Sequence, residues 1–389
     1  MKDKYDLIIV GAGPAGLTAG ISAKSNSDMN ILILEKQMRP GNRSRGETLK
    51  FDPFLENKIF DPGFIDKITV NKTSKYRFYS PSNKKYIEIE ALQKRYMINW
   101  HEFINALVEK AIKNGIELQV KHEVKELIFK DEIYQGVKGV DDFKGFEVKS
   151  NLLILADGSE NSIINKYGYQ TPKENHLILK VIAENVNFKE NIVELFFSTG
   201  ENMPPGVLSI FPRSETSAEA NYVQFADSNA KDLRFWWDKI CSEMPIFSDR
   251  FKNSSILHFD IARLPFGGPT LDVLVPTPRI FLAGDNAGHV PATSGAGLVS
   301  SMKMAHEIGK IVSEIHGSGE IDKYFSSDTM KQITKRLRKT AIYRDLKEKA
   351  QVAVDIRKAF FKTLITPEKI DEKWDTFIAP TLKNAVEFF

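Results

Sequence analysis

The feature that most constrains the fold is a glycine-rich turn directly after an apolar segment near the start of the chain. Residues 5–10 read YDLIIV and are followed at once by GAGPAG at 11–16. A short apolar run that ends in closely spaced glycines is typical of a strand that turns into a helix against a bound pyrophosphate. A second apolar run, 31–34, ends in Glu35, where a carboxylate can accept a hydrogen bond from a ribose hydroxyl. These residues predict a Rossmann-type dinucleotide-binding unit.

Two later motifs favour FAD over NAD as the dinucleotide. LADGS at 155–159 closes an apolar strand, so its Asp-Gly pair is expected where a turn approaches the cofactor's diphosphate. FLAGD at 281–285 ends another apolar strand with Asp285 at its carboxyl end. Asp285 can accept a hydrogen bond from a ribityl hydroxyl, which FAD has and NAD lacks. Gly295 and Gly297 precede a helical run, whose positive N-terminal end can face the carbonyl oxygens of a flavin.

Composition excludes several other classes of site and partner. The formal net charge of +3 is too small to indicate nucleic-acid binding, and there is no stripe of interleaved aromatic and basic residues. Cys241 is the only cysteine, so we expect no intramolecular disulfide and no metal site. We find no signal peptide and no apolar run of about 18 residues that would span a bilayer. We therefore expect a cytoplasmic protein whose membrane contact, if any, is peripheral on the inner face.

The order of elements predicts an α/β fold in which a substrate domain built on an antiparallel β-sheet interrupts the FAD-binding domain. The predicted segments are 1–50, 96–169 and 278–329 for the FAD-binding domain, 51–95 and 170–277 for the substrate domain, and 330–389 for a helical C-terminal region. The start of that last region is basic, which suggests contact with anionic lipid headgroups. Its apolar residues Ile333, Leu337 and Leu346 recur at helical spacing, which slightly favours packing on the FAD-binding domain instead.

The same motifs, in this order, resemble the geranylgeranyl reductase family, which has the p-hydroxybenzoate hydroxylase fold. The resemblance covers residues 1 to about 310, and beyond the FAD motifs it rests on PPGVLSIFP at 204–212, LPFGG at 264–268 and GDNAGHVPATSGAGL at 284–298. Members saturate isoprenoid double bonds, so the resemblance implies an FAD-dependent reductase of geranylgeranyl chains, with archaeal-type ether lipids as substrates. The expected FAD-binding residues are Gly11, Gly13, Pro14, Ala15, Gly16, Glu35, Lys36, Arg45, Gly46, Val124, Asp157, Gly158, Gly284, Asp285, Gly295, Ala296, Gly297 and Leu298. The expected substrate-binding residues are Phe196, Val207, Ser209, Ile210, Phe211, Pro265, Gly267 and Gly268, although an apolar strand face is more often core than pocket.

The chain departs from the family pattern at three places. Arg45 stands before Gly-Glu at 46–47, where many relatives have a cysteine, which excludes a cysteine-dependent mechanism at that position. Val207 and Ser209 replace an aromatic pair, which predicts a wider or differently shaped pocket. Residues 99–100 are Asn-Trp, where the family has an acidic and a basic residue.

Reduction of an isolated alkene requires a hydride donor over one carbon and a proton donor near the other. The motifs bring His289, Arg45 and Glu47 nearest to the flavin ring, and His289 alone titrates near neutral pH without perturbation. His289 is thus a candidate proton donor, with a helix cap, a phosphate contact or an ordered water as alternatives. No second GxGxxG unit follows a strand, so no separate nicotinamide domain is visible. NAD(P)H and reduced ferredoxin both stay open as the electron donor.

Two other functions stay open. A flavin-dependent monooxygenase or halogenase on the same fold would use the cavity for an aromatic or other small substrate. A non-catalytic electron-transfer flavoprotein would dock a ferredoxin or quinone partner through the basic C-terminal region and would need no deep cavity.

Overall fold

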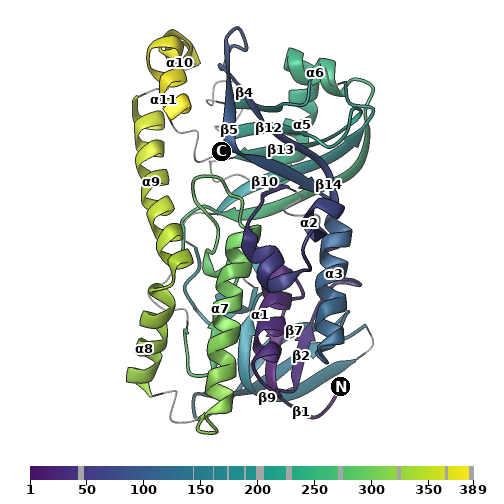
Figure 1. Ribbon diagram of the computed structural model, residues 1–389, viewed down its shortest axis with the longest axis vertical. Helices are drawn as coiled ribbons and strands as arrows, with labels where there is room; N and C mark the ends of the chain where they lie inside the picture. The colour runs from purple at the N-terminus through teal and green to yellow at the C-terminus, as the bar shows by residue number, and fades with distance from the viewer. Residues whose placement is uncertain are drawn as a thin grey trace.

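A computed structural model of the chain describes residues 1–42, 48–142, 144–160, 162–172, 175–187, 190–198, 206–224, 230–269, 275–321, 326–363 and 367–384. Within them the chain forms two β-sheets with helices packed around both, and a helical C-terminal region along one side (Figure 1). This arrangement confirms the predicted α/β fold class. The boundaries between the domains stay predictions.

The first sheet has a parallel centre. Its parallel strands are β1 (Lys4–Val10), β2 (Ile31–Leu34), β6 (Glu117–Gln119), β9 (Gly145–Leu155) and β15 (Ile280–Leu282). Two antiparallel strands extend it: β8 (Ile133–Val140) pairs with β9, and β7 (Glu123–Lys130) pairs with β8. β2 and β15 are buried at every residue, as expected for parallel strands covered on both faces. The helices α1 (Pro14–Ser25), α3 (Trp100–Lys113) and α7 (Leu298–Gly317) belong to this half, where α1 contacts both of the others.

The second sheet has the strand order β14-β10-β13-β12-β11-β4-β5-β3. The bounds are β3 (Thr48–Lys50), β4 (Thr69–Tyr79), β5 (Tyr86–Ile98), β10 (Asn175–Glu184), β11 (Val193–Ser198), β12 (Gly206–Pro212), β13 (Ser217–Gln224) and β14 (Ser255–Pro265). All neighbours are antiparallel except β4 and β11. The helices α5 (Ala230–Glu243) and α6 (Pro245–Phe251) pack on one face. The short elements between strands are η1 (Leu55–Ile59), α2 (Phe64–Lys67), η2 (Gly158–Glu160) and α4 (Ser162–Lys166), and η3 (Asp285–Ala287) lies between β15 and α7.

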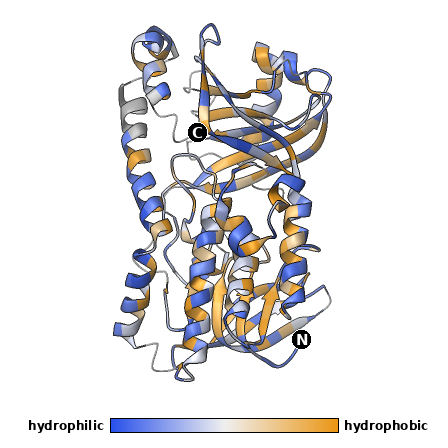
Figure 2. Cartoon of the chain, in the orientation of Figure 1, coloured by the Kyte–Doolittle hydropathy of each residue, from blue (hydrophilic) through white to orange (hydrophobic). Residues whose placement is uncertain are grey.

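Alternation along the strands separates the two faces of the second sheet. Leu179, Leu208 and Tyr222 are fully buried and share an apolar core with residues of α5 and α6. The residues directly before and after each of these in its strand point to the other face, because successive side chains of a strand alternate. Figure 2 shows the apolar residues concentrated on the strands of both sheets and on stripes of the helices.

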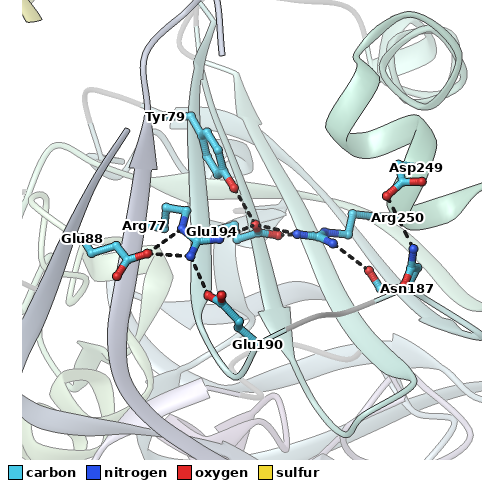
Figure 3. Close-up of polar contacts among 8 residues, drawn as sticks. All are labelled: Arg77, Tyr79, Glu88, Asn187, Glu190, Glu194, Asp249 and Arg250. Atoms are coloured by element: carbon cyan, nitrogen blue, oxygen red, sulfur yellow. Dashed lines mark hydrogen bonds and ion pairs between the residues drawn. The ribbon is translucent and has the colours of Figure 1, made fainter. Parts of the chain in front are cut away.

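A buried ionic network connects this sheet to α6 (Figure 3). The carboxylate of Glu194 on β11 accepts hydrogen bonds from the Tyr79 hydroxyl at 2.8 Å and from Arg250 Nη2 at 3.0 Å. Arg77 Nη1 lies 3.8 Å from the same carboxylate and also pairs with two glutamates at the surface. Because Glu194 is only 2% exposed, its charge depends on these partners rather than on water.

The C-terminal region ties the two halves together. It consists of α8 (Ser327–Arg338), α9 (Ala341–Thr363), α10 (Pro367–Glu372), η5 (Trp374–Ile378) and α11 (Ala379–Asn384), and it follows the long axis of the molecule (Figure 1, yellow). Ile333, Leu337 and Leu346 are buried in the core of the first half, whereas Trp374 and Ile378 are buried against β4 and β5. The apolar stripe predicted from the sequence therefore packs on the FAD-binding half. Among the described residues, no helix is both long and apolar enough to cross a membrane.

Candidate functional site

A cavity of about 410 Å³ lies between the two sheets. One wall comes from the carboxyl ends of β1, β2 and β9 and from the turns that follow β9 and β15. The opposite wall comes from β10, β12, β13 and β14. The carboxyl edge of parallel strands is where open α/β sheets bind their ligands, so the cavity is the candidate cofactor and substrate site.

The turn between β1 and α1 is shaped for close approach of a ligand. Gly11 has φ +101°, and a Cβ there would lie 2.3 Å from the carbonyl oxygen of Ala156. A Cβ at Gly16 would lie 2.0 Å from the carbonyl oxygen of Gly11, so only glycine allows α1 to pack this closely. A Cβ at Gly13 would meet no atom within 4 Å, and Gly13 lines the cavity with Pro14 and Ala15. The turn therefore presents bare backbone and open space, as a bound pyrophosphate requires.

Glu35 is held rigidly at the cavity wall beside this turn. Its Oε2 accepts a hydrogen bond from the N–H of Ala12 and its Oε1 accepts one from the N–H of Gln37, both at 2.8 Å. Each carboxylate oxygen keeps a second lone pair for a ribose hydroxyl. Lys36 pairs with Glu160 across the same end of the cavity, and Val124 also lines it. This end fits the adenosine half of FAD.

Asp157 supplies a buried acceptor in the middle of the cavity wall. Its Oδ1 accepts a hydrogen bond from Asn286 Nδ2 at 2.9 Å, and among the described residues its Oδ2 has no hydrogen-bond partner. Burial raises the pKa of this carboxyl group, against the opposing effect of the Asn286 hydrogen bond. Gly158 lines the cavity next to it with φ +75°. An acceptor left without a donor in such a place fits a hydroxyl-bearing cofactor.

The turn after β15 brings Asp285 to the cavity, but it does not bring His289 there. Gly284 and Asp285 line the cavity, whereas His289 is fully buried behind them. His289 Nδ1 accepts a hydrogen bond from the N–H of Gly284 at 3.1 Å, and burial lowers the pKa of the imidazole to about 3. A neutral imidazole is too weak an acid to protonate an alkene carbon, and this buried ring does not line the cavity. The structure therefore assigns His289 to holding the turn rather than to the proton transfer considered from the sequence.

The N-terminus of α7 closes the inner end of the cavity. Gly295, Ala296, Gly297 and Leu298 all line it, and α7 begins at Leu298. The first N–H groups of a helix have no partner within the helix, and the helix dipole adds positive potential at that end. The placement fits the electron-rich edge of a flavin ring.

Residues 99–100 have local structural roles. The Asn99 side chain caps α3 by accepting a hydrogen bond from the N–H of Glu102 at 3.3 Å. Trp100 lines the cavity, and its Nε1 donates a hydrogen bond to the carbonyl oxygen of Gly41 at 3.0 Å. Arg45, Gly46 and Glu47 lie outside the described residues, so their expected contacts stay predictions.

The residues expected to bind substrate divide between the two faces of the second sheet. Ser209 and Phe211 line the cavity. Phe196 and Ile210 lie on the opposite face instead, in the core with α5 and α6. Side chains alternate along a strand, and Ile210 lies between two cavity-facing residues while Phe196 pairs with the core residue Leu208. The remaining four, Val207, Pro265, Gly267 and Gly268, are not among the lining residues. Gly268 packs on α9, where a Cβ would lie 2.4 Å from the Cβ of Ala350.

The cavity residues that escaped the sequence-based prediction include Lys180, Glu219, Asn221 and Asp260. A signal was present, since Lys180 interrupts the apolar run LILKVIA and Glu219 and Asn221 alternate with alanines in SAEANYV. A single charge within an apolar strand indicates a buried polar group. Only the fold shows that the group faces a cavity.

The glycine turn, the fixed Glu35, the unpartnered Asp157 oxygen and the α7 N-terminus form one continuous wall that fits FAD from adenosine to flavin ring. They define a Rossmann-type flavoprotein whose cofactor wall faces a separate β-sheet. The chain belongs to the FAD binding domain family, whose sequence profile matches residues 4–327.

Known proteins extend this assignment. The digeranylgeranylglycerophospholipid reductase of Methanococcus vannielii is 27% identical over 343 residues, which cover 86% of this chain and 83% of that protein. A geranylgeranyl bacteriochlorophyll reductase-like protein of Thermoplasma acidophilum has a similar structure, with a TM-score of 0.75 at 19% identity over 100% of both chains. The flavin-dependent brominase Bmp2 matches with a TM-score of 0.67 at 16% identity, over 99% of this chain and 94% of the brominase. The predicted resemblance to the geranylgeranyl reductases is confirmed, and the chain is an FAD-dependent oxidoreductase.

Proposed function

We propose that this protein is an FAD-dependent reductase that saturates C=C bonds of geranylgeranyl chains, with digeranylgeranylglycerophospholipid of the archaeal type as its substrate class. The observation that carries the proposal is that one cavity joins the FAD-binding wall to the second sheet, so a substrate on that sheet faces the cofactor. The names of the curated relatives supply the substrate class.

In this proposal FAD, once bound and reduced, supplies the hydride. The residues of the chain bind and orient. Gly13 would hold the pyrophosphate of the cofactor and the N-terminus of α7 its flavin end, while Phe211 and Trp100 would exclude water from the space beside it. Because His289 is sealed off, the proton for the second alkene carbon comes from a water in the cavity or from the segment that carries Arg45 and Glu47.

The electron donor in this proposal is NAD(P)H or reduced ferredoxin, and the rate of flavin bleaching after anaerobic mixing with each would distinguish them. Contact with a membrane surface belongs to the proposal as well. Lys331 and Lys335 of α8 are exposed and available to anionic headgroups. Salt-sensitive sedimentation of the protein with anionic vesicles, but not with neutral ones, would support that contact, and equal sedimentation would contradict it.

The test of the reaction is anaerobic. The FAD-loaded protein is reduced with dithionite and offered geranylgeranyl diphosphate and digeranylgeranylglycerophospholipid, and the products are read by mass spectrometry. We expect stepwise gain of hydrogen pairs. The variant Gly13→Val, whose side chain fills the pyrophosphate space, should lose both FAD and activity.

Unchanged lipid with the flavin bound and reduced would refute the proposal. A flavin-dependent monooxygenase or halogenase is the second candidate, because the sheet opposite the cofactor wall carries charged side chains and the brominase shares the fold. Rapid oxygen consumption with NAD(P)H and a small aromatic substrate would favour it. A reduced flavin that turned over with ferredoxin or quinone alone would favour an electron carrier.

A further inference from the structure

A line of polar side chains crosses the cavity face of the second sheet. The strand register places Ser209 on β12 opposite Asn221 on β13, Asn221 opposite Lys180 on β10, and Lys180 opposite Asp260 on β14. Glu219 lies two residues before Asn221 on the same face, with Oε1 at 3.2 Å from Lys180 Nζ. All five line the cavity. We call these five residues the polar row.

Four residues of the polar row are buried, Asp260 is partly exposed, and the row is flanked by apolar positions. Glu219 is 2% exposed, and Asn221, Ser209 and Lys180 are no more than 9% exposed, so water does not solvate the charges in bulk. The next line of paired residues on the same face is apolar and consists of Val207, Val223, Ile178 and Ala262. A buried ion pair is weak evidence for stability, because apolar residues of similar size often serve the fold as well. The stability of the fold therefore does not explain these charges, and binding of a ligand in the cavity would.

Within the polar row, hydrogen-bond acceptors rather than donors lack partners. Asn221 Nδ2 donates to Glu219 Oε1 at 3.0 Å, which orients the amide. Among the described residues, Glu219 Oε2, Asn221 Oδ1 and Asp260 Oδ2 have no hydrogen-bond partner. All three atoms are acceptors. Buried acceptors are rarely left unpaired, so the missing partner is a hydrogen-bond donor.

Charge further narrows the class of ligand. Burial opposes ionisation of Glu219, but Lys180, the Asn221 amide and Arg213 together lower the pKa of its carboxyl group, which keeps it charged. Glu219 lies against the cations Lys180 and Arg213, and Arg95 and Arg263 also line the cavity, so cations compensate the carboxylates of the polar row. A neutral donor fits such a site better than an ammonium ion or a phosphate, and the neutral donor common in lipids is a hydroxyl group.

We propose that the polar row binds a neutral hydroxyl group on the head of the isoprenoid substrate and so sets the register of the chain against the FAD-binding wall. The proposal rests on the proposed function for the isoprenoid part of the ligand. The apolar residues beside the polar row would hold the chain, and the anchored hydroxyl would decide which double bond lies opposite the cofactor.

The test compares each alcohol with its methyl ether, in which a methyl group replaces the hydroxyl hydrogen and removes the donor. The FAD-loaded full chain is titrated with geranylgeraniol and with its O-methyl ether, and binding is followed by the change in flavin absorbance. A second pair, 2-naphthol and 2-methoxynaphthalene, asks the same question without a prenyl chain. We expect geranylgeraniol to bind about 10-fold or more tightly than the ether, the range of a hydrogen bond to a charged group.

Two variants locate this preference in the polar row. Asn221→Leu removes an acceptor at similar volume, and Glu219→Gln removes the carboxylate charge. Both should reduce the alcohol-to-ether ratio toward 1 and change the affinity for the ether little. Glu184→Gln, an exposed change on the same strand as Lys180, is the matched control and should keep the native ratio. Retained flavin absorbance and ether binding show that each variant is folded. If either variant does not fold, the milder Ser209→Ala takes its place.

The outcomes separate this proposal from the proposed function. Equal binding of geranylgeraniol and its ether to the native protein would overturn the role of the polar row and leave the prenyl reductase intact. Binding of 2-naphthol in preference to its ether, with neither prenyl compound bound, would support a hydroxyl site and overturn the prenyl substrate. No preference for the alcohol in either pair, or a preference that survives in both variants, would overturn the proposal.

Discussion

Glu35→Gln measures how much one carboxylate contributes to binding the adenosine half of FAD. In the structure this carboxylate lines the cavity and is fixed by two backbone N–H groups at 2.8 Å. A ribose hydroxyl that donates to it would make a hydrogen bond to a charged acceptor, worth about 1.5–3 kcal/mol. The neutral amide keeps the length of the side chain and loses the charge. We expect the Kd for FAD to rise about 10- to 100-fold.

The comparison that makes this prediction specific is FMN, which has the same flavin but no adenosine. The apo-protein is titrated with each flavin, and the quenching of flavin fluorescence gives the two Kd values. The Kd for FMN should change by less than about 3-fold, since no ribose hydroxyl reaches Glu35 in that complex. Glu109→Gln, an exposed change on α3, is the matched control and should alter neither value. An equal loss of affinity for FAD and FMN would refute the reasoning, because it would mean that Glu35 acts only by shaping the glycine turn.

Three further predictions concern stability. Glu194→Gln leaves Arg250 poorly compensated in the interior and should lower the free energy of unfolding in urea by about 3 kcal/mol. Glu88→Gln at the surface should cost no more than about 1 kcal/mol, and equal costs would contradict the importance of burial. The folded pKa of His289, about 3, is below its unfolded value of 6.5, so below pH 6.5 the unfolded chain binds a proton that the folded chain does not. Its contribution to stability is complete above that pH and falls by about 1.4 kcal/mol per pH unit as the pH decreases toward 3, a slope that His289→Asn should lack relative to the native chain. Trp374→Ala should remove about 3–5 kcal/mol of packing between the C-terminal region and β4–β5, and protease should then cut that region first; cutting at unchanged sites would argue against this docking.

Local spacing was enough to predict the cofactor wall. The strand, the glycines of 11–16 and the helix are consecutive in the chain, and Glu35 directly follows the next strand. Parallel strands bring their carboxyl ends to one edge whatever the rest of the fold does, so Asp157 and Asp285 were also predictable at that edge. The helical C-terminal region followed from its 3.6-residue periodicity in the same way.

The direction of individual side chains was decided only by the tertiary structure. The motif places His289 near the flavin site, but the backbone of the turn after β15 directs its ring into the interior, where it accepts a hydrogen bond from Gly284. Alternation along β12 predicts that Ser209 and Ile210 face opposite ways, yet it does not say which face is the cavity. That choice depends on α5 and α6, which cover the face of Ile210 and leave the face of Ser209 to the cofactor wall.

The amino-acid sequence by itself determined the Rossmann-type turn, the FAD motifs and the alternation of the strands, because each depends on residues within one or two neighbouring elements. Only the tertiary structure decided that Lys180, Ser209, Asn221 and Asp260 form one row. These residues come from four strands, and their alignment depends on the hydrogen-bonded register between strands far apart in the chain. A shift of a single residue in that register would turn one strand's polar side chain away from the cavity. The short-range periodicity of the sequence does not specify the register between distant strands.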